Sequence, residues 1–370
     1  MREDKISRTQ LMCLLWAGVM APAAEMLPAL LSTGAGKGAW LSVLLSAPLV
    51  LAAGWLLAGL AGEQGLPDGL TALLGKAGGR AVLLLYIVWA QLLLALRLRL
   101  CAQRLAASGG RDGSLWYFLL ALAALLLWMG RGRLGAFARA GQLFLIALLA
   151  TAGAVLLLSV FQARPERLFP LWWREGFPVA RAALPAAGMA GWGLFASFLM
   201  GAVKDQGERK NWYWLSWGLG GMALLAAAQG VILGNLGAGL AAALPSPFFS
   251  LAKSVGIEGA FQRVEGVVAA LWTFADLVMG GVLIFAIRAI GEELFPRSAG
   301  KWIPWAAVFL GTALALAVFP ALGTAEEWNN KLVPAGNLIL GLALPAAIWA
   351  VRWPRGRAHF GAEKPERPKI

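Results

Sequence analysis

The stretch Ala17–Pro22 (AGVMAP) interrupts the first long apolar segment of this chain, and Ala187–Gly193 (AGMAGWG) interrupts the sixth. Each interruption begins about nine residues into its segment, which is roughly mid-bilayer at about 1.5 Å of rise per residue. Small residues and proline at this depth predict that both helices are broken. Two breaks five segments apart are what an inverted repeat of five plus five helices leaves in a sequence.

The composition places the whole chain in a membrane. Of its 370 residues, 59% are hydrophobic and only 14% are charged, whereas about a quarter of a soluble domain is charged. Helices are expected throughout, because an open strand cannot satisfy its backbone in lipid. The sequence therefore predicts an all-α polytopic membrane protein with ten transmembrane helices in a LeuT-like five-plus-five inverted repeat, with helices 1 and 6 broken. The expected spans are residues 9–31, 39–61, 80–105, 114–130, 140–161, 179–203, 212–236, 264–288, 302–319 and 333–351.

This repeat divides the chain into four parts. We expect a first five-helix repeat at 1–161, an external connector at 162–178, a second five-helix repeat at 179–351 and a disordered cytoplasmic tail at 352–370. With the N-terminus in the cytoplasm, 20 of the 32 Lys and Arg residues fall on the cytoplasmic side. The positive-inside rule therefore predicts that both termini are cytoplasmic.

Several functional classes are disfavoured by the same residues. The formal charge of +13 lies in short connections between apolar segments, which argues for the lipid bilayer and against nucleic acid as the partner. The single histidine, His359, is in the tail, and the chain contains no HExxH motif and no phosphate-binding loop. Cys13 and Cys101 have no metal-ligand spacing. We therefore expect neither an enzyme nor a bound metal or cofactor.

The two interruptions are candidate ligand sites, through the residues Gly18, Pro22, Gly188, Gly191 and Gly193. A helix broken in mid-membrane frees N–H and C=O groups that protein, water or ligand must satisfy. The N-terminal end of the second half-helix suits a carboxylate, and glycine lets a ligand approach the backbone closely. The alternative is that these residues only pack helices together and kink them.

Acidic residues within the spans are further candidates, because a carboxylate there is costly unless it faces a cavity or a partner. Glu25 follows the first interruption and has three possible roles: it contacts the ammonium group of a ligand, pairs with Arg97, or reaches water. Arg97 and Glu265 are candidates for a structural ion pair. Arg99 and Arg104 are expected to snorkel to the interface.

The eighth span carries a face of possible ligand contacts. Glu265, Trp272, Asp276 and Gly280 follow one another at intervals of 7, 4 and 4 residues and so share one side of the helix. Asp276 is the most deeply placed acid of the chain, and the hydroxyl of Thr273 lies beside it. This face has two possible roles. It lines a cavity that binds a cation, a proton or an ammonium group; alternatively, Asp276 is a buried hydrogen-bonded acid that fixes the packing of the helix.

Four stretches resemble a known family, and they span most of the chain. They are Ile6–Leu11 before the first span, Gly38–Ser42 at the start of the second, Phe198–Lys204 at the end of the sixth, and the segment from Phe261 through Trp272 to Arg297. In this order and spacing the chain resembles the B subunit of the Ger-type nutrient germinant receptors of bacterial spores. These belong to the spore permease family within the amino acid–polyamine–organocation superfamily.

The resemblance implies a nutrient-sensing subunit in the spore inner membrane that works with an A subunit and a lipoprotein C subunit. It implies an amino-acid-type nutrient held between spans one, three, six and eight, against the two interruptions and the face of Trp272 and Asp276. Binding would signal by a conformational change. The alternative is a secondary amino-acid transporter coupled to H⁺ or Na⁺, with Asp276 or Glu25 as the coupling group, and a third possibility is a channel or scaffold without a ligand.

Overall fold

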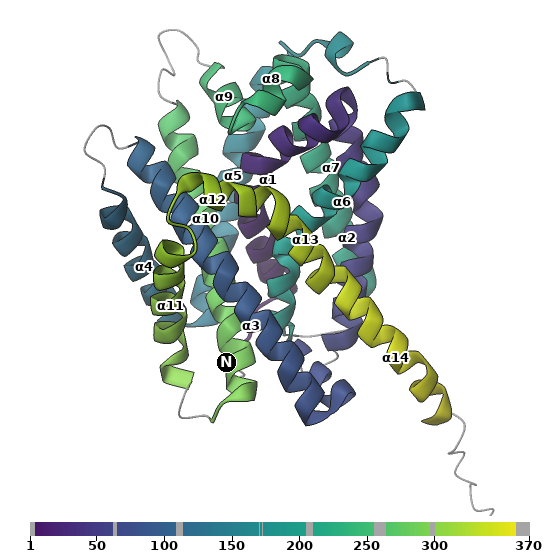
Figure 1. Cartoon of the computed structure of the whole chain (residues 1–370), viewed down its shortest axis with the longest axis vertical. Helices are drawn as coiled ribbons and strands as arrows, with labels where there is room; N and C mark the ends of the chain where they lie inside the picture. The colour runs from purple at the N-terminus through teal and green to yellow at the C-terminus, as the bar shows by residue number, and fades with distance from the viewer. Residues whose placement is uncertain are drawn as a thin grey trace, which may run out of the picture.

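The computed structural model describes residues 4–61, 65–108, 114–169, 171, 173–204, 210–254, 264–296 and 300–359. Its long helices run side by side along the long axis of the molecule, with the short helices α8 and α9 at one end and the N-terminus towards the other (Figure 1). The first half of the chain forms α1 (Arg8–Ala35), η1 (Gly36–Gly38), α2 (Ala39–Ala61), α3 (Leu66–Ser108), α4 (Leu115–Arg131), α5 (Leu134–Val160), η2 (Pro165–Arg167) and η3 (Trp173–Glu175).

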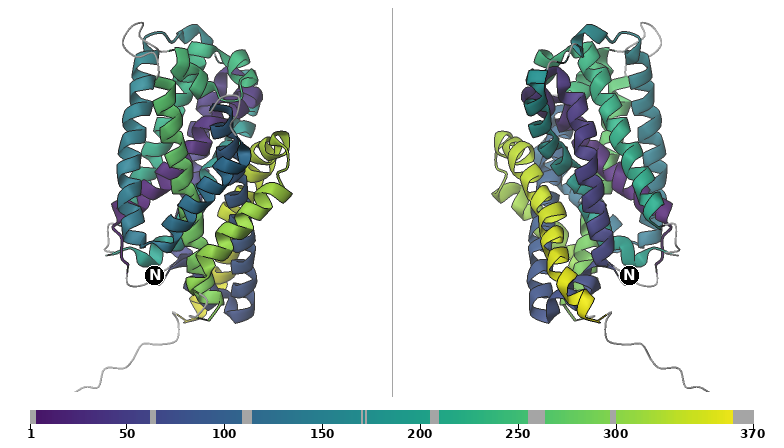
Figure 2. Two further views of the ribbon diagram at one scale, coloured as in Figure 1. Left: turned by 90° about the vertical axis from the view of Figure 1, so that its left-hand side faces the viewer. Right: turned by 90° about the vertical axis from the view of Figure 1, so that its right-hand side faces the viewer.

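The second half contains α6 (Gly176–Ala190), η4 (Gly191–Ala202), α7 (Lys210–Leu236), α8 (Ala238–Ala243), α9 (Pro247–Ser254), α10 (Val264–Leu294), α11 (Ile303–Ala317), α12 (Leu322–Glu327), η6 (Trp328–Leu332), α13 (Val333–Leu338), η7 (Ile339–Ala343) and α14 (Leu344–His359). Of these, η6 and η7 are π-helical segments. The last helices, α12 to α14, lie along one side of the bundle in both views of Figure 2. The helix α14 extends to His359, beyond the span end expected at residue 351, so the first residues of the expected tail are helical.

The described residues include seven helical stretches that are long and apolar enough to cross a membrane. Two shorter apolar helices, α4 and α11, lie beside them. The first stretch combines the second part of α1 with α2, so each of the ten expected spans has a helical counterpart. Large apolar side chains such as Trp128 on α4 and Phe309 on α11 are exposed on the outside, as a lipid-facing surface requires. The chain is an integral membrane protein.

The expected break in the first span is absent, because α1 is one helix from Arg8 to Ala35 with Pro22 and Pro28 inside it. A proline removes one backbone N–H and can kink a helix without unwinding it. Gly18 accommodates a neighbouring helix: a Cβ atom there would lie 2.9 Å from the terminal methyl of Met279 on α10. Close packing against α10 thus explains Gly18 without a ligand.

The sixth span changes helix type where the sequence predicts its break. The helix α6 ends at Ala190, and the twelve residues Gly191–Ala202 continue as the 3-10 helix η4. Runs of 3-10 helix longer than three or four residues are uncommon. The Gly191 N–H lies within hydrogen-bonding reach of three carbonyls, those of Ala187, Gly188 and Met189.

The helix α13 packs directly against this junction. A side chain at Gly188 would collide with the carbonyl oxygen of Pro334, and a Cβ atom on Gly191 would lie 2.7 Å from that of Asn337. The buried Asn337 amide donates to the Gly188 carbonyl (3.0 Å) and accepts from the Trp89 indole N–H of α3 (2.9 Å). A protein side chain, not a ligand, therefore satisfies the Gly188 carbonyl.

The N-terminal residues close the opposite end of η4. Ser7 caps α1 in a capping box with Gln10. The Ile6 N–H donates to the Ala202 carbonyl (2.9 Å), and the Lys204 N–H donates to the Ile6 carbonyl (2.8 Å). Two of the four stretches that carry the family resemblance, Ile6–Leu11 and Phe198–Lys204, thus contact each other through their backbones.

Replacing Gly188 by Ala should destabilise the protein by about 1–3 kcal/mol, because the added methyl group meets backbone atoms that cannot move independently. Thermal unfolding of the purified protein in detergent measures the change. Gly153→Ala on α5 is the matched control, since a Cβ atom there has no neighbour within 4 Å. Equal unfolding midpoints for the two variants would contradict this account of the junction.

Candidate functional site

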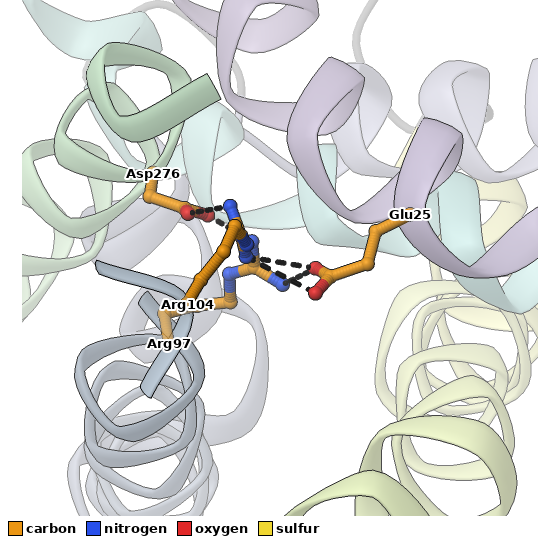
Figure 3. Close-up of polar contacts among 4 residues, drawn as sticks. All are labelled: Glu25, Arg97, Arg104 and Asp276. Atoms are coloured by element: carbon orange, nitrogen blue, oxygen red, sulfur yellow. Dashed lines mark hydrogen bonds and ion pairs between the residues drawn. The ribbon is translucent and has the colours of Figure 1, made fainter. Parts of the chain in front are cut away.

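Four charged side chains from three helices meet inside the bundle, and we call them the charge network. They are Glu25 of α1, Arg97 and Arg104 of α3, and Asp276 of α10. The two guanidinium groups lie between the two carboxylates (Figure 3). Their formal charges sum to zero, which is the condition for keeping such groups away from water.

Each carboxylate contacts both arginines. One Asp276 oxygen accepts from Arg97, and the other accepts from Arg104 at 2.9 Å. Both Glu25 oxygens lie 3.1 Å from Nη2 of Arg104, and one of them lies 3.4 Å from Nη1 of Arg97. Charge-assisted hydrogen bonds of this kind are about twice as strong as neutral ones.

The network has a buried end and an accessible end. The side chains of Arg97 and Asp276 are 2% and 3% exposed, whereas those of Arg104 and Glu25 are 19% and 21% exposed. The contact between Glu25 and Arg104 is therefore less buried than the contact between Arg97 and Asp276.

The buried end also touches the first turn of η4. The Arg97 guanidinium carbon lies 5.5 Å from the ring centroid of Trp192, a cation–π distance. Trp192 is fully buried, and neither its indole nitrogen nor Nε of Arg97 has a hydrogen-bond partner among the described residues. The network thus contacts the junction between α6 and η4 through Trp192.

Helical periodicity explains why these residues converge. Arg97 and Arg104 are seven residues apart on α3, so they share one side of that helix. The same interval separates Glu25 from Gly18, which contacts Met279 of α10. The face of α1 that packs against α10 therefore carries Glu25 towards Asp276, which lies three residues before Met279.

The remaining candidates of α10 are not members of the charge network. The Trp272 ring packs on Phe248 and Phe249 of α9, with centroids 4.9 and 5.2 Å away. Thr273 is half-buried in α10 beside it. Glu265 belongs to the first turn of α10, but its side chain lies outside the described part of the chain. The sequence did not identify Arg104 as a site residue.

The expectation that Arg99 and Arg104 snorkel to the interface is wrong. Arg104 belongs to the charge network. Arg99 is 5% exposed and donates to the carbonyls of Phe319 (2.7 Å) and Pro320 (3.0 Å) just beyond the end of α11. A helix end leaves carbonyls unsatisfied, and a cation there is favourable.

A separate cavity of 420 Å³ lies between α1, α2, α7, the junction of α6 with η4, and the junction of α13 with η7. Gly191 and Gly193 border it, and its lining is almost entirely apolar. No member of the charge network lines it. Gly193 also packs against α1, because a Cβ atom there would lie 3.0 Å from Cγ of Leu15.

The fold is that of LeuT-like membrane transporters. Over 92% of this chain and 89% of the other, the structure resembles the crystal structure of MhsT in complex with L-phenylalanine, with a TM-score of 0.66 and 16% identity. It also resembles the manganese transporter of Eremococcus coleocola, crystallised with an aromatic bis-isothiourea substituted compound (TM-score 0.54, 16% identity, 90% and 77% covered). The predicted fold class, an all-α LeuT-like membrane protein, is thereby confirmed, whereas the break predicted in the first span is absent.

Residues 5–321 match the family model described as spore germination protein, so the chain belongs to the spore permease family. The resemblance stated from the sequence is confirmed. No curated protein matches the chain. It is therefore a germination-related, permease-like membrane protein.

Replacing Asp276 by Asn should lower the free energy of unfolding by about 3–5 kcal/mol, because one buried guanidinium charge loses its partner. Adding Arg97→Gln should restore part of this loss by removing the uncompensated charge. Thermal unfolding in detergent measures both changes. The control is Glu327→Gln, which breaks an exposed pair with Lys331 and should cost less than about 1 kcal/mol. If Asp276→Asn behaves like this control, the network does not stabilise the fold.

Proposed function

We propose that this chain is the nutrient-sensing subunit of a spore germinant receptor. In this proposal a small amino-acid-type ligand binds at the charge network, in the middle of the membrane. Binding shifts the population between two arrangements of the helices, and partner subunits detect the shift. The family and the fold are of the permease type, which supports binding of a small solute.

The observation that carries the proposal is the presence of both charge signs at the accessible end of the network. A zwitterionic amino acid could offer its carboxylate to Arg104 and its ammonium group to Glu25. This exchange replaces one ion pair by two and leaves the net charge of the site at zero. No buried charge is then left without a partner, which is the costly outcome at such a site.

The packing of the helices explains how such an exchange could produce a signal. Glu25 belongs to α1, which packs against α10, α5 and α6. Arg97 and Arg104 belong to α3, which packs against α4, α10 and α11. Both helices pack against α10, and the contacts of Glu25 join α1 to α3 beside it. A ligand inserted there changes the energy of the relative placement of α1 and α3.

The family also supports the expected assembly and location. We propose that the chain acts with a receptor A subunit and a lipoprotein C subunit in the spore inner membrane. The distribution of Lys and Arg residues supports cytoplasmic termini.

Glu25→Gln should raise the nutrient concentration needed for half-maximal germination by about tenfold, which corresponds to about 1.4 kcal/mol of lost ligand binding. The assay complements the deletion strain and screens the L-amino acids and common sugars. Glu326→Gln, at an exposed position of α12, is the control, and immunoblots of spore membranes report accumulation of each variant. An unchanged response in Glu25→Gln spores with normal protein levels would refute the proposed ligand contact.

The second candidate is an amino-acid transporter coupled to H⁺ or Na⁺, which the likeness to solved transporters favours. Both carboxylates already contact arginines, so a coupling ion at either one must displace a guanidinium group. Uptake of labelled amino acids into vesicles under an imposed H⁺ or Na⁺ gradient tests this function. Uptake that Asp276→Asn abolishes would establish transport, whereas ligand binding without uptake favours sensing. If neither uptake nor ligand binding is detected, the remaining possibility is a channel or a scaffold without a ligand.

A further inference from the structure

We propose that the adjoining ends of α4 and α11 bind the phosphate group of an anionic phospholipid. The binding residues are Arg131 at the end of α4, and Lys301 and Trp305 at the start of α11, and we call them the headgroup site. The site lies at the end of the molecule that carries the N-terminus, because the neighbouring Arg133 pairs with Asp4 (2.8 Å). It shares no residue with the charge network, so the proposal is independent of the ligand assigned there.

The side chain of Arg131 is held in place and still has free donors. It is exposed, and its guanidinium carbon lies 5.1 Å from the ring centroid of Trp305, a cation–π contact that joins α4 to α11. Within the described part of the chain, Arg131 forms neither an ion pair nor a hydrogen bond. A phosphate group can therefore accept from two of its N–H groups at once, the geometry that a guanidinium group favours.

The carboxylates near this site are bound to other groups. Glu292 pairs with Arg288 (3.2 Å), and Glu293 accepts a hydrogen bond from the α3 hydroxyl at 3.4 Å. Lys301 is exposed and, like Arg131, has no carboxylate partner among the residues that the structure describes. These two cations therefore carry positive charge that direct contact does not neutralise, which favours an anionic ligand over a zwitterionic one.

Aromatic side chains place the site at the level of lipid headgroups. Trp128, Trp302 and Phe309 are 76%, 70% and 66% exposed, and the rings of Trp305 and Phe309 stack with centroids 6.1 Å apart. Indole rings concentrate at the boundary between hydrocarbon and headgroups, where lipid phosphates also lie. The exposed rings offer an apolar surface to the acyl chains of the lipid whose phosphate Arg131 binds.

The lengths of the two helices bring headgroups close to this site. The 17 residues of α4 and the 15 residues of α11 rise by about 26 and 23 Å at about 1.5 Å per residue, less than the hydrocarbon thickness of about 30 Å. A bilayer accommodates short helices by local thinning, which moves the lipid phosphates towards the helix ends. The ends of α4 and α11 are therefore where a phosphate reaches an arginine most easily.

A bound lipid would stabilise the helices that carry the charge network. The helices α4 and α11 pack against each other and against α3 and α10. At the end of α4, a Cβ atom on Gly130 would lie 2.6 Å from Cγ2 of Ile284 on α10, so the two helices are in close contact there. A phosphate shared by Arg131 and Lys301 bridges α4 and α11, and a ligand that binds only the folded protein raises its stability.

Native mass spectrometry of the full-length protein in detergent tests the proposal. The protein is titrated with dioleoyl phosphatidylglycerol or with dioleoyl phosphatidylcholine, which has the same chains and phosphate but no net charge. We expect the first phosphatidylglycerol to bind about tenfold more tightly than the first phosphatidylcholine, and to raise the thermal unfolding midpoint more. Equal affinities for the two lipids would overturn the proposal.

Variants distinguish a built site from a diffuse surface charge. Arg131→Gln should weaken phosphatidylglycerol binding about fivefold, the factor that corresponds to about 1 kcal/mol for one basic residue near the headgroups, and leave phosphatidylcholine binding unchanged. Lys301→Gln serves the same purpose if Arg131→Gln does not accumulate. The matched control is Arg139→Gln, which removes an exposed arginine from the second turn of α5 and should change the affinity less than twofold. Equal weakening in this control, or unchanged binding in both site variants, contradicts the proposal.

Two further measurements test the role of the ring and the source of the phosphate. Trp305→Leu should weaken phosphatidylglycerol binding several-fold because Arg131 loses its cation–π contact, and unchanged affinity would refute that role. Millimolar glycerol phosphate should not displace the lipid, whereas full displacement would assign the site to a free phosphate compound and overturn the assignment to lipid. Phosphatidylglycerol with a diazirine in its acyl chain should label α4 and α11 preferentially, and equal labelling of all lipid-facing helices would contradict a specific site.

Discussion

Removing an arginine from water costs several kilocalories per mole unless carboxylates and hydrogen bonds compensate it. Arg97 is 2% exposed, and its charge is compatible with the fold only because Asp276 and Glu25 lie against it. These partners come from α10 and α1, which are far from α3 in the sequence. The charge network therefore fixes how three helices are rotated and how far each is inserted.

The sequence was informative about position along each helix and much less so about rotation around it. The ten spans, the fold class and the change of backbone conformation at Gly191 could all be predicted, because hydropathy and small residues report depth. The prediction of a helix break at Pro22 was wrong, since one proline in a well-packed helix need not unwind that helix. Arg104 and Arg99 were assigned to the interface from their depth alone, because nothing in a single sequence shows which neighbour a helix face meets.

The glycines at the two interruptions have a different structural role from the one that the sequence predicted. Gly18 and Gly188 allow α10 and α13 to approach, and protein atoms occupy the space that a ligand was expected to use. Gly191 has both roles, because it packs against Asn337 and also borders the cavity. The first turn of η4 consequently contacts the charge network through Trp192 and the cavity through the glycines on either side of it.

The unusual length of η4 has a mechanical consequence. Twelve residues span about 24 Å as a 3-10 helix but about 18 Å as an α-helix, because the rise per residue is about 2.0 and 1.5 Å respectively. The far end of η4 is hydrogen-bonded to Ile6, just ahead of α1. If part of this segment rewound into the wider form, it would shorten and draw the start of the chain inwards. This shortening of η4 would convert a change of helix type inside the membrane into a displacement of the N-terminal residues at the end of the molecule where they lie.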